Sequence, residues 1–285
     1  MNEPYLTKEK INAFIEAALL EDVGEGDHST LACIPVDKIG KANLLIKEQG
    51  IVAGLEMAKM IFEFFDPNLQ VNLLLEDGQP VRNGDIGLVV EGSAASILTT
   101  ERLVLNCLQR MSGIATKTHW YTHLISHTPA IILDTRKTTP NFRMLEKWAV
   151  SLGGGQNHRF ALYDMIMLKD NHIDFAGGIR KAIASTHEYL NRNHLDLQIE
   201  VETRNLEDVQ EVLEVGGVDY IMLDNMDEVM MKKAVQMINH RIKTEASGGI
   251  SEETVKMVAE CGVDFISIGA LTHHIKSLDI SLKAV

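Results

Sequence analysis

The chain has few of the features that are typical of membrane proteins, secreted proteins or proteins with a structural zinc site. Among its 285 residues, no apolar run approaches the ~20 residues of a membrane-spanning helix. The segment Met1 to Tyr5 has neither a basic nor an apolar stretch, so we expect no secretory signal and no membrane partner. Three cysteines, Cys33, Cys107 and Cys261, are far apart and form no Cys-x-x-Cys pair. We expect them to be small buried side chains in a reducing cytoplasm, neither disulfide partners nor zinc ligands.

Positive charge is also scarce. The 27 Lys and Arg residues stand against 40 Asp and Glu, which gives a formal net charge of −13 and argues against a nucleic-acid partner. The cations that exist are concentrated in one segment. From Arg102 to Lys169, nine Lys and Arg stand against three Asp and Glu, a net charge of +6, whereas the rest of the chain has −19. Such a segment predicts a small ligand with several negative charges.

The first part of the chain has the pattern of an α+β domain. Its length and its 45% hydrophobic residues suit a globular protein with one large unit and a smaller one. Apolar spacing predicts helices at 7–21, 54–65 and 95–111, and alternation with turn signals predicts strands at 42–47, 70–75 and 86–91.

From Pro129 onward, short apolar runs alternate with helical patterns. Strands are predicted at 130–133, 166–168, 198–201, 220–223, 243–246 and 265–268, and helices at 179–190, 206–215, 226–238 and 252–261. These spacings suit parallel βαβ crossovers. The chain has no glycine-rich dinucleotide fingerprint, so the residues favour a closed α/β barrel over a doubly wound sheet.

Polar side chains follow each predicted strand, and in a barrel these positions meet at the C-terminal face. Three subsites are predicted there. The first, for a di- or tricarboxylate, consists of Arg136, His158, Arg159 and Lys169. The second offers backbone N–H groups to a phosphate, from Ser247-Gly248-Gly249 and Gly269-Ala270. The third has Glu202 and Asp224, which suit Mg²⁺ or ribose hydroxyls.

Each group also has a simpler interpretation. Ser-Gly-Gly is often only a turn, and a single Glu202 or Asp224 could cap a helix. Arg136 could form a structural ion pair with Asp134. His119, His123 and His127 have the spacing of a metal-binding stripe, or of a solvated helix face. Three subsites on successive strands nevertheless favour a binding site.

These residues resemble the quinolinate phosphoribosyltransferases, a family of type II phosphoribosyltransferases. The matching blocks, in order, are Glu101-Arg102, Ser112–Thr116, Asp134–Pro140, Gly153-Gly154-Gly155, His158-Arg159, Leu168–His172, Glu200-Val201-Glu202, Met222–Asn225, Ser247-Gly248-Gly249 and Gly269–His273. An earlier block, Glu21-Asp22 with Gly26-Asp27, extends the resemblance over nearly the whole chain.

The resemblance implies an N-terminal open-faced α/β sandwich at 1–111 and an incomplete α/β barrel at 112–285, with a tail at 273–285 that packs back on the first domain. It implies a cytoplasmic pentosyltransferase of NAD biosynthesis. The expected substrates are quinolinate and 5-phosphoribosyl 1-diphosphate, and the products nicotinate mononucleotide, diphosphate and CO₂, with Mg²⁺ as cofactor. A homodimer with a shared site is expected, and a hexamer is left open.

The resemblance also assigns roles by position. Arg102 is expected to come from the neighbouring subunit, and Thr135 to bind substrate. Arg136, His158, Arg159 and Lys169 form the quinolinate pocket, with Lys137 near the phosphoribosyl diphosphate. Glu202 and Asp224 serve ribose and Mg²⁺, directly or through water. The 5-phosphate is assigned to Ser247, Gly248, Gly249, Ile268, Gly269 and Ala270, and the catalytic residues are Lys137, Lys169, Glu202 and Asp224.

Two departures from the family pattern concern loop shape. Asn141-Phe142 stands where the family usually has Gly-Leu, and His274 where Ser often follows Thr-His. Two rival functions also stay open. One is a transferase of the same fold acting on another aromatic acid, against which the pair Arg136 and Arg159 favours a dicarboxylate. The other is a non-catalytic sensor of anionic metabolites, which would need none of Lys137, Glu202 and Asp224.

Overall fold

The structure is a computed structural model that describes residues 3–285, so the first two residues of the expected N-terminal domain lie outside the described range. The chain forms two compact units that interleave in sequence. Unit 1 consists of Met1–His119, Thr138–Gly154 and Ala270–Val285, and unit 2 of Trp120–Lys137 and Gly155–Gly269. The expected division of the chain at residues 111 and 112 stays a prediction.

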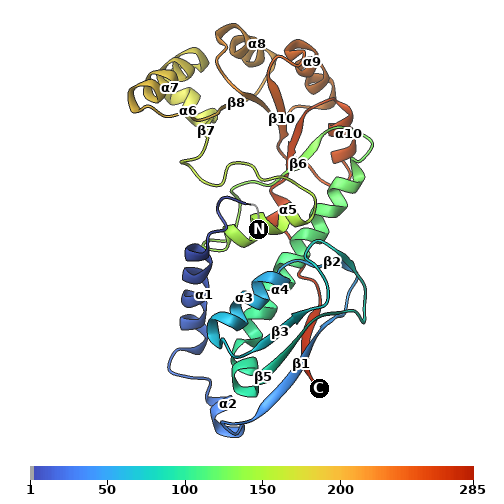
Figure 1. Ribbon diagram of the computed structural model, residues 1–285. Helices are drawn as coiled ribbons and strands as arrows, with labels where there is room; N and C mark the ends of the chain where they lie inside the picture. The colour runs from blue at the N-terminus through green and yellow to red at the C-terminus, as the bar shows by residue number, and fades with distance from the viewer. Residues whose placement is uncertain (1–2) are drawn as a thin grey trace. The chain divides into compact units, whose positions relative to one another are not determined.

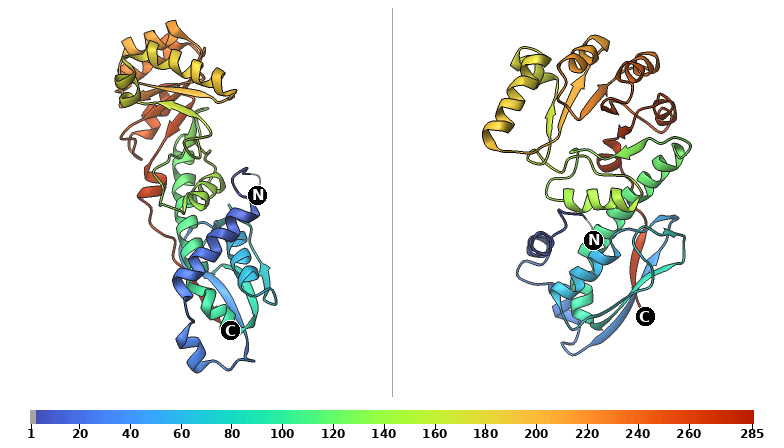
Figure 2. Two further views of the ribbon diagram at one scale, coloured as in Figure 1. Left: turned by 90° about the vertical axis from the view of Figure 1, so that its left-hand side faces the viewer. Right: turned by 45° about the horizontal axis from the view of Figure 1, so that its top comes forward.

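Unit 1 contains a four-stranded antiparallel sheet in the order β12-β1-β5-β3. The three predicted strands are present, as β1 (Ile39–Ile46), β3 (Gln70–Leu73) and β5 (Ile86–Ser93). The fourth, β12 (Ile280–Ala284), comes from the end of the chain and pairs along β1 (Figure 2). Its side chains Ile280 and Leu282 are buried, so this edge of the sheet is closed by an apolar strand.

Helices accompany this sheet in unit 1, and most of them have buried apolar residues. They are α1 (Lys8–Val23), α2 (His28–Cys33), α3 (Leu55–Phe65), α5 (Arg143–Leu152) and α11 (Ala270–His273), with a short strand pair β2 (Gly50–Ile51) and β4 (Pro80–Val81). Helix α3 is the predicted helix, and its buried face includes Ile61 and Phe62. The half-buried Asp77 carboxylate accepts the backbone N–H groups of Gly54 and Leu55 at 2.7 and 2.8 Å, which fixes where α3 begins.

Helix α4 (Ala94–Leu124) has 31 residues and is the longest element (Figure 1). The prediction that it ends at Met111 was wrong, because the Ser112-Gly113 pair inside it looks like a helix end. A side chain at Gly113 would overlap the backbone of Lys276, so glycine serves here to let that segment lie against the helix.

Unit 2 is built on a six-stranded parallel sheet in the order β6-β11-β10-β9-β8-β7. All six predicted strands are present, as β6 (Ile131–Leu133), β7 (Ile166–Leu168), β8 (Ile199–Thr203), β9 (Tyr220–Asp224), β10 (Lys243–Ser247) and β11 (Phe265–Ser267). The helices that follow them are α6 (Asp170–Ala176), α7 (Ile179–Asn193), α8 (Leu206–Val215), α9 (Glu228–Ile238) and α10 (Val255–Glu260), which lie outside the strands (Figure 1).

This sheet curves as an incomplete α/β barrel, as the resemblance implied, and the expectation of a closed barrel was wrong. The edge strands are β6 and β7, and the described residues show no ladder between them. A single parallel bridge from Leu133 to Gln156 occupies the free edge of β6. The segment that follows α5 thus runs where a closing strand would lie, and it carries His158 and Arg159.

Two whole-chain expectations can be compared with the described residues. No helix there is long and apolar enough to span a membrane. All three cysteines are free; Cys107 and Cys261 are buried as expected, whereas Cys33 is exposed at the end of α2, so its prediction as a buried side chain was wrong.

Candidate active site

The C-terminal ends of the parallel strands surround a cavity of about 280 Å³ within unit 2. Every strand except β8 contributes a lining residue from its end or from the loop that follows. The lining residues are Thr135, Arg136, Lys137, His158, Arg159, Met167, Lys169, Met222, Glu245, Ser247 and Ser267. Four of them are Lys or Arg. The structure therefore brings together the cations that were predicted to converge.

Arg136 and Lys137 reach this cavity because β6 ends at Leu133 and the chain turns immediately after it. The turn is held by the Thr135 hydroxyl, which accepts the Lys137 N–H at 3.0 Å. Lys169 comes from the end of β7 and is the N-cap residue of α6. Its ammonium lies 3.7 Å from the Glu202 carboxylate and is half exposed, so this pair leaves its charge available to a ligand.

Arg159 lies in the cavity near a second guanidinium. Burial lowers its pKa, and the charge of Arg136 lowers it further. Its Nη1 donates to the Met165 carbonyl at 3.1 Å, which orients the side chain without neutralising it. Two like charges held this way repel each other, and a ligand with two carboxylates would relieve the repulsion.

The loop that carries His158 and Arg159 is attached to the end of β6 by a buried carboxylate. Asp134 Oδ2 accepts from Asn157 Nδ2 at 2.7 Å, and its Oδ1 accepts the His158 N–H at 2.9 Å. Gln156 N–H also donates to the Ile132 carbonyl at 2.9 Å. Asp134 is completely buried, so the loss of any of these bonds would leave a buried polar group without a partner. The bonds therefore hold the loop in place.

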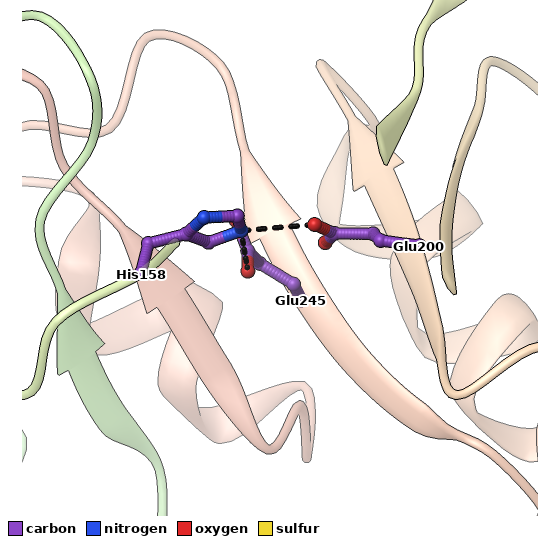
Figure 3. Close-up of side chains that lie close together, drawn as sticks. All are labelled: His158, Glu200 and Glu245. Carbon is purple, nitrogen blue, oxygen red and sulfur yellow. Dashed lines mark hydrogen bonds and ion pairs between the residues drawn. The ribbon is translucent and has the colours of Figure 1, made fainter. Parts of the chain in front are cut away.

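The His158 ring reaches across the barrel to two buried glutamates (Figure 3). Its Nε2 lies 2.9 Å from Glu200 Oε2 on β8 and 3.3 Å from Glu245 Oε2 on β10. The exposed fractions of the three side chains are 8%, 0% and 2%. His158 was predicted to supply charge to the ligand, but the structure directs its Nε2 toward these two acids instead.

This cluster holds a proton well above neutral pH. Burial alone would lower the pKa of His158, but the hydrogen bonds to Glu200 and Glu245 raise it to about 10. Burial and the charge of Glu245 also raise the pKa of Glu200, against the effect of His158. The Arg159 N–H donates to His158 Nδ1 at 2.8 Å, so a proton on Nδ1 would break that bond. The extra proton therefore belongs to the cluster as a whole.

Glu202 and Asp224 end the neighbouring strands β8 and β9. Burial raises the pKa of Glu202, and the charge of Asp224 raises it further, while Lys169 opposes both. Asp224 Oδ2 accepts from the Asn225 amide at 2.7 Å. Two carboxylates this close to each other beside a cationic cavity are a suitable oxygen-ligand pair for Mg²⁺.

The predicted phosphate-binding residues lie at the ends of β10 and β11. Gly248 and Gly249 have φ angles of 96° and 59°, and a side chain at Gly248 would overlap Asn225. Only glycine fits such a turn, and its backbone N–H groups are suited to an anion. Ile268 and Gly269 follow β11, and Ala270 begins α11. The Ile268 N–H already donates to the Leu133 carbonyl at 3.0 Å. It is therefore used within the sheet and is not available to a phosphate.

Two other predicted groups lie apart from this cavity's lining. Arg102 is on α4 in unit 1, exposed, one helical turn from the exposed Leu98. The histidine stripe forms no metal cluster among residues 3–285. His127 lies beyond the end of α4, where it contacts Glu260 at 3.0 Å.

Known proteins resemble this chain over nearly its full length. Residues 27–112 match the family model for "Quinolinate phosphoribosyl transferase, N-terminal domain", and residues 114–283 match the model for its C-terminal domain. This chain belongs to the quinolinate phosphoribosyltransferase family.

Individual relatives agree with that assignment. The chloroplastic nicotinate-nucleotide pyrophosphorylase [carboxylating] of Arabidopsis thaliana is 50% identical over 288 residues, which cover 96% of this chain and 82% of that protein. A probable nicotinate-nucleotide pyrophosphorylase [carboxylating] of Synechocystis is 42% identical, covering 96% and 92%. The crystal structure of NadC from Streptococcus pyogenes superposes with a TM-score of 0.92 at 40% identity, covering 99% and 100%.

Sequence reasoning missed inward-facing residues that lie two positions before the predicted site residues. Glu200 precedes Glu202, and Glu245 precedes Ser247, so each pair shares a face of its strand. Period-two spacing was the signal that could have found them. It would also have drawn attention to Met167, Met222 and Ser267, which line the cavity from three further strands.

The family departures have a local explanation. Asn141 has a φ of 62°, a left-handed conformation that glycine adopts freely and asparagine tolerates best among other residues. Phe142 packs edge-on against Phe14 in unit 1, with ring centroids 5.6 Å apart. The carbonyl of His274 accepts from Lys117 at 2.6 Å through its backbone, which does not depend on the side chain.

Proposed function

We propose that this protein transfers the phosphoribosyl group of 5-phosphoribosyl 1-diphosphate to quinolinate, with loss of CO₂, to give nicotinate mononucleotide and diphosphate. One observation carries the proposal beyond family membership: Arg136 and Arg159 lie together in one cavity with Lys169, close enough for one guanidinium to lower the pKa of the other. A monocarboxylate would leave one of these cations without a counterion. Quinolinate has two carboxylates on neighbouring carbons.

The cationic cavity has a first task in binding, because both substrates are anions that repel each other. Arg136, Arg159 and Lys169 bind the two carboxylates, and each guanidinium can form a paired hydrogen bond. Lys137, from the same turn as Arg136, binds the phosphoribosyl diphosphate. Ser247, Gly248 and Gly249 bind its 5-phosphate through hydroxyl and backbone N–H groups.

The chemistry then follows from charge. The ring nitrogen of quinolinate donates its electron pair to C1 of the sugar while the bond from C1 to diphosphate breaks. The nitrogen is now positively charged and withdraws electrons from the ring. The bond from C2 to its carboxylate breaks, CO₂ leaves, and the electron pair that remains on C2 takes a proton. The protein needs no nucleophile for these steps; it holds the reactants in line.

Glu202 and Asp224 are the residues that would hold Mg²⁺, directly or through water. A divalent cation bound there would offset negative charge on the diphosphate. Lys169, which lies 3.7 Å from Glu202, connects this carboxylate pair with the quinolinate subsite.

We further propose a homodimer in which Arg102 enters the site of the neighbouring subunit. Exposed apolar side chains on unit 1 support an interface there: Leu98 lies on α4 one turn before Arg102, and the others, Leu20, Leu31, Val36 and Ile39, lie on the segment from α1 to β1. A hexamer stays open. A reducing compartment such as the cytoplasm fits three free cysteines, although plant relatives are named chloroplastic or mitochondrial.

The test is an assay of diphosphate release with both substrates and Mg²⁺. We expect release only when quinolinate and 5-phosphoribosyl 1-diphosphate are both present. Release with nicotinate alone as acceptor would support a transferase for another aromatic acid. Tight binding of quinolinate with no turnover would support the metabolite sensor.

A further inference from the structure

We propose that Glu200 and Glu245 are positioning residues for quinolinate, acting through His158 on Arg159; this proposal rests on the proposed function. They are not expected to touch the reacting atoms. Their role is to hold the His158 ring in one orientation and one tautomer, so that the loop after α5 presents Arg159 to the cavity beside Arg136.

The geometry begins with the open edge of the barrel. The segment Gln156 to His158 follows β6 for one bridge, and Asp134 holds it from the β6 side, so a further contact is needed to hold the loop from the interior of the barrel. The His158 ring crosses to β8 and β10 and bonds to a carboxylate on each (Figure 3). A side chain thus replaces the backbone ladder that a closing strand would have supplied.

The second step is the link from the ring to Arg159. His158 Nδ1 accepts the backbone N–H of Arg159 at 2.8 Å, so the orientation of the ring fixes the start of Arg159. This bond requires an unprotonated Nδ1, and the hydrogen of the neutral ring is then on Nε2, where it faces Glu200 and Glu245. Rotation of the ring, or the other tautomer, would lose both contacts at once.

The same three side chains have the composition of a metal site, with ligand atoms within 4.8 Å of one another. The contact at Nδ1 argues against that interpretation. A metal would need the electron pair of Nε2, and the ring proton would then be on Nδ1, where the Arg159 N–H already donates. The geometry therefore favours a hydrogen-bonded support over a metal centre.

A purely stabilising role also fits poorly. Glu200 Oε1 and Glu245 Oε1 are buried and have no hydrogen-bond partner within the described residues. Two acids buried with unused acceptor atoms beneath an anion-binding cavity cost stability, and apolar side chains would pack there at lower cost. A role in orienting the His158 ring, which anchors Arg159, would account for two acids at these positions.

The test compares variants of both acids in steady-state kinetics. For Glu200→Ala and Glu245→Ala we expect the KM for quinolinate to rise about tenfold or more, with little change in the KM for the phosphoribosyl donor, because a buried donor loses its acceptor. Glu200→Gln keeps an acceptor for His158 Nε2 and should restore most of the affinity. In an Arg159→Lys background, adding Glu200→Ala should have a smaller effect than it has alone.

The matched control is Thr244→Val. Thr244 is buried on β10 next to Glu245 but on the opposite face, where its hydroxyl contacts Asp264 at 2.9 Å. This variant should lower the melting temperature and leave both KM values unchanged. If Glu200→Ala and Glu245→Ala do the same, or raise both KM values together, the two acids are structural and the proposal fails.

The ¹⁵N NMR spectrum of the wild-type imidazoles gives a second readout that does not need activity. We expect one histidine with its proton on Nε2, and this signal should change in Glu200→Gln. A proton on Nδ1, or stoichiometric binding of Zn²⁺ that Glu200→Gln abolishes, would overturn the proposal in favour of a metal site. Absence of wild-type turnover with quinolinate would instead refute the proposed function and leave the tautomer result standing.

Discussion

At the scale of single residues, the site depends on where charge is buried and what opposes it. Arg136 and Arg159 repel each other in the cavity, whereas His158 is surrounded by acids and contributes no net positive charge to it. Arginine and histidine are both basic residues, but in this site they have different tasks. In the proposed function the two arginines bind the ligand, and in the further proposal the histidine holds the loop from which one of them projects.

The arginines yield the simplest prediction. Arg136→Ala or Arg159→Ala should lower kcat/KM for quinolinate, because a charge-assisted contact to the ligand is lost. The corresponding rise in the activation free energy should be about 2–4 kcal/mol. The melting temperature should change little, since both side chains project into the cavity. Arg180→Ala on α7 is the control, because the side chain of that arginine is exposed and forms a 3.8 Å surface pair with Glu214. A variant that melts early while keeping near-normal kcat/KM would assign its arginine to a structural ion pair.

The buried cluster around His158 predicts how stability depends on pH. In the folded state the pKa of His158 is about 10, above the ordinary histidine value of 6.5, so the folded cluster keeps a proton that the unfolded chain releases. This contribution to stability is fully present below pH 6.5 and is lost as pH rises through about 10. The difference in melting temperature between wild type and His158→Gln should therefore shrink between pH 6.5 and 10. A difference that is constant over this range would mean that the cluster does not hold the proton.

At the scale of elements, the sequence predicted those whose pattern is local and repetitive. All six strands of the parallel sheet, three strands of the antiparallel sheet and the main helices after β7 could be located from period two and period 3.6. The missed elements depend on distant partners. Strand β12 forms by pairing with the edge of β1. The glycine at position 113 does not end α4; it leaves room beside the helix for the backbone of Lys276.

The same limit applies to the candidate site. Its charged rim could be predicted, because Arg, Lys and Asp at strand ends are conspicuous in an acidic chain. The His158 cluster could not, because its ring contacts Glu200, 42 positions away, and the still more distant Glu245, and the strands that carry them become neighbours of the ring only once the barrel is assembled. Glycines at 248 and 249 were predicted as a phosphate turn, but their left-handed φ angles are visible only in the folded chain.

The turn before α5 gives a prediction at this scale. Asn141 has a φ of 62°, so Asn141→Ala should lower the free energy of unfolding by about 1 kcal/mol, while Asn141→Gly should leave it nearly unchanged. Urea denaturation of the three proteins measures both effects. Equal stability of the Ala and Gly variants would show that the left-handed conformation is not maintained in solution.

At the scale of the whole molecule, the proposed dimer makes activity a property of two chains. Arg102 is exposed on α4, and it does not line the cavity of its own chain. If the neighbouring subunit supplies it, isolated monomers should be nearly inactive.

Subunit exchange tests this. Arg102→Ala and Lys169→Ala proteins should each be inactive, and mixed dimers should have one intact site. Random pairing restores up to about a quarter of wild-type activity. If mixed dimers are verified and show no recovery, Arg102 acts within its own chain or has no part in the site.

The central claim is that the cavity with Arg136 and Arg159 selects an acid with two carboxylates and removes one of them. The most direct measurement uses quinolinate labelled in its 2-carboxylate, with nicotinate as the competing acceptor. We predict release of labelled CO₂ and diphosphate in equal amounts, and a kcat/KM for quinolinate at least about tenfold higher than for nicotinate, because nicotinate has only one carboxylate to offer to the two neighbouring guanidinium groups. Comparable kcat/KM values for the two acids, or diphosphate released without CO₂, would contradict the account.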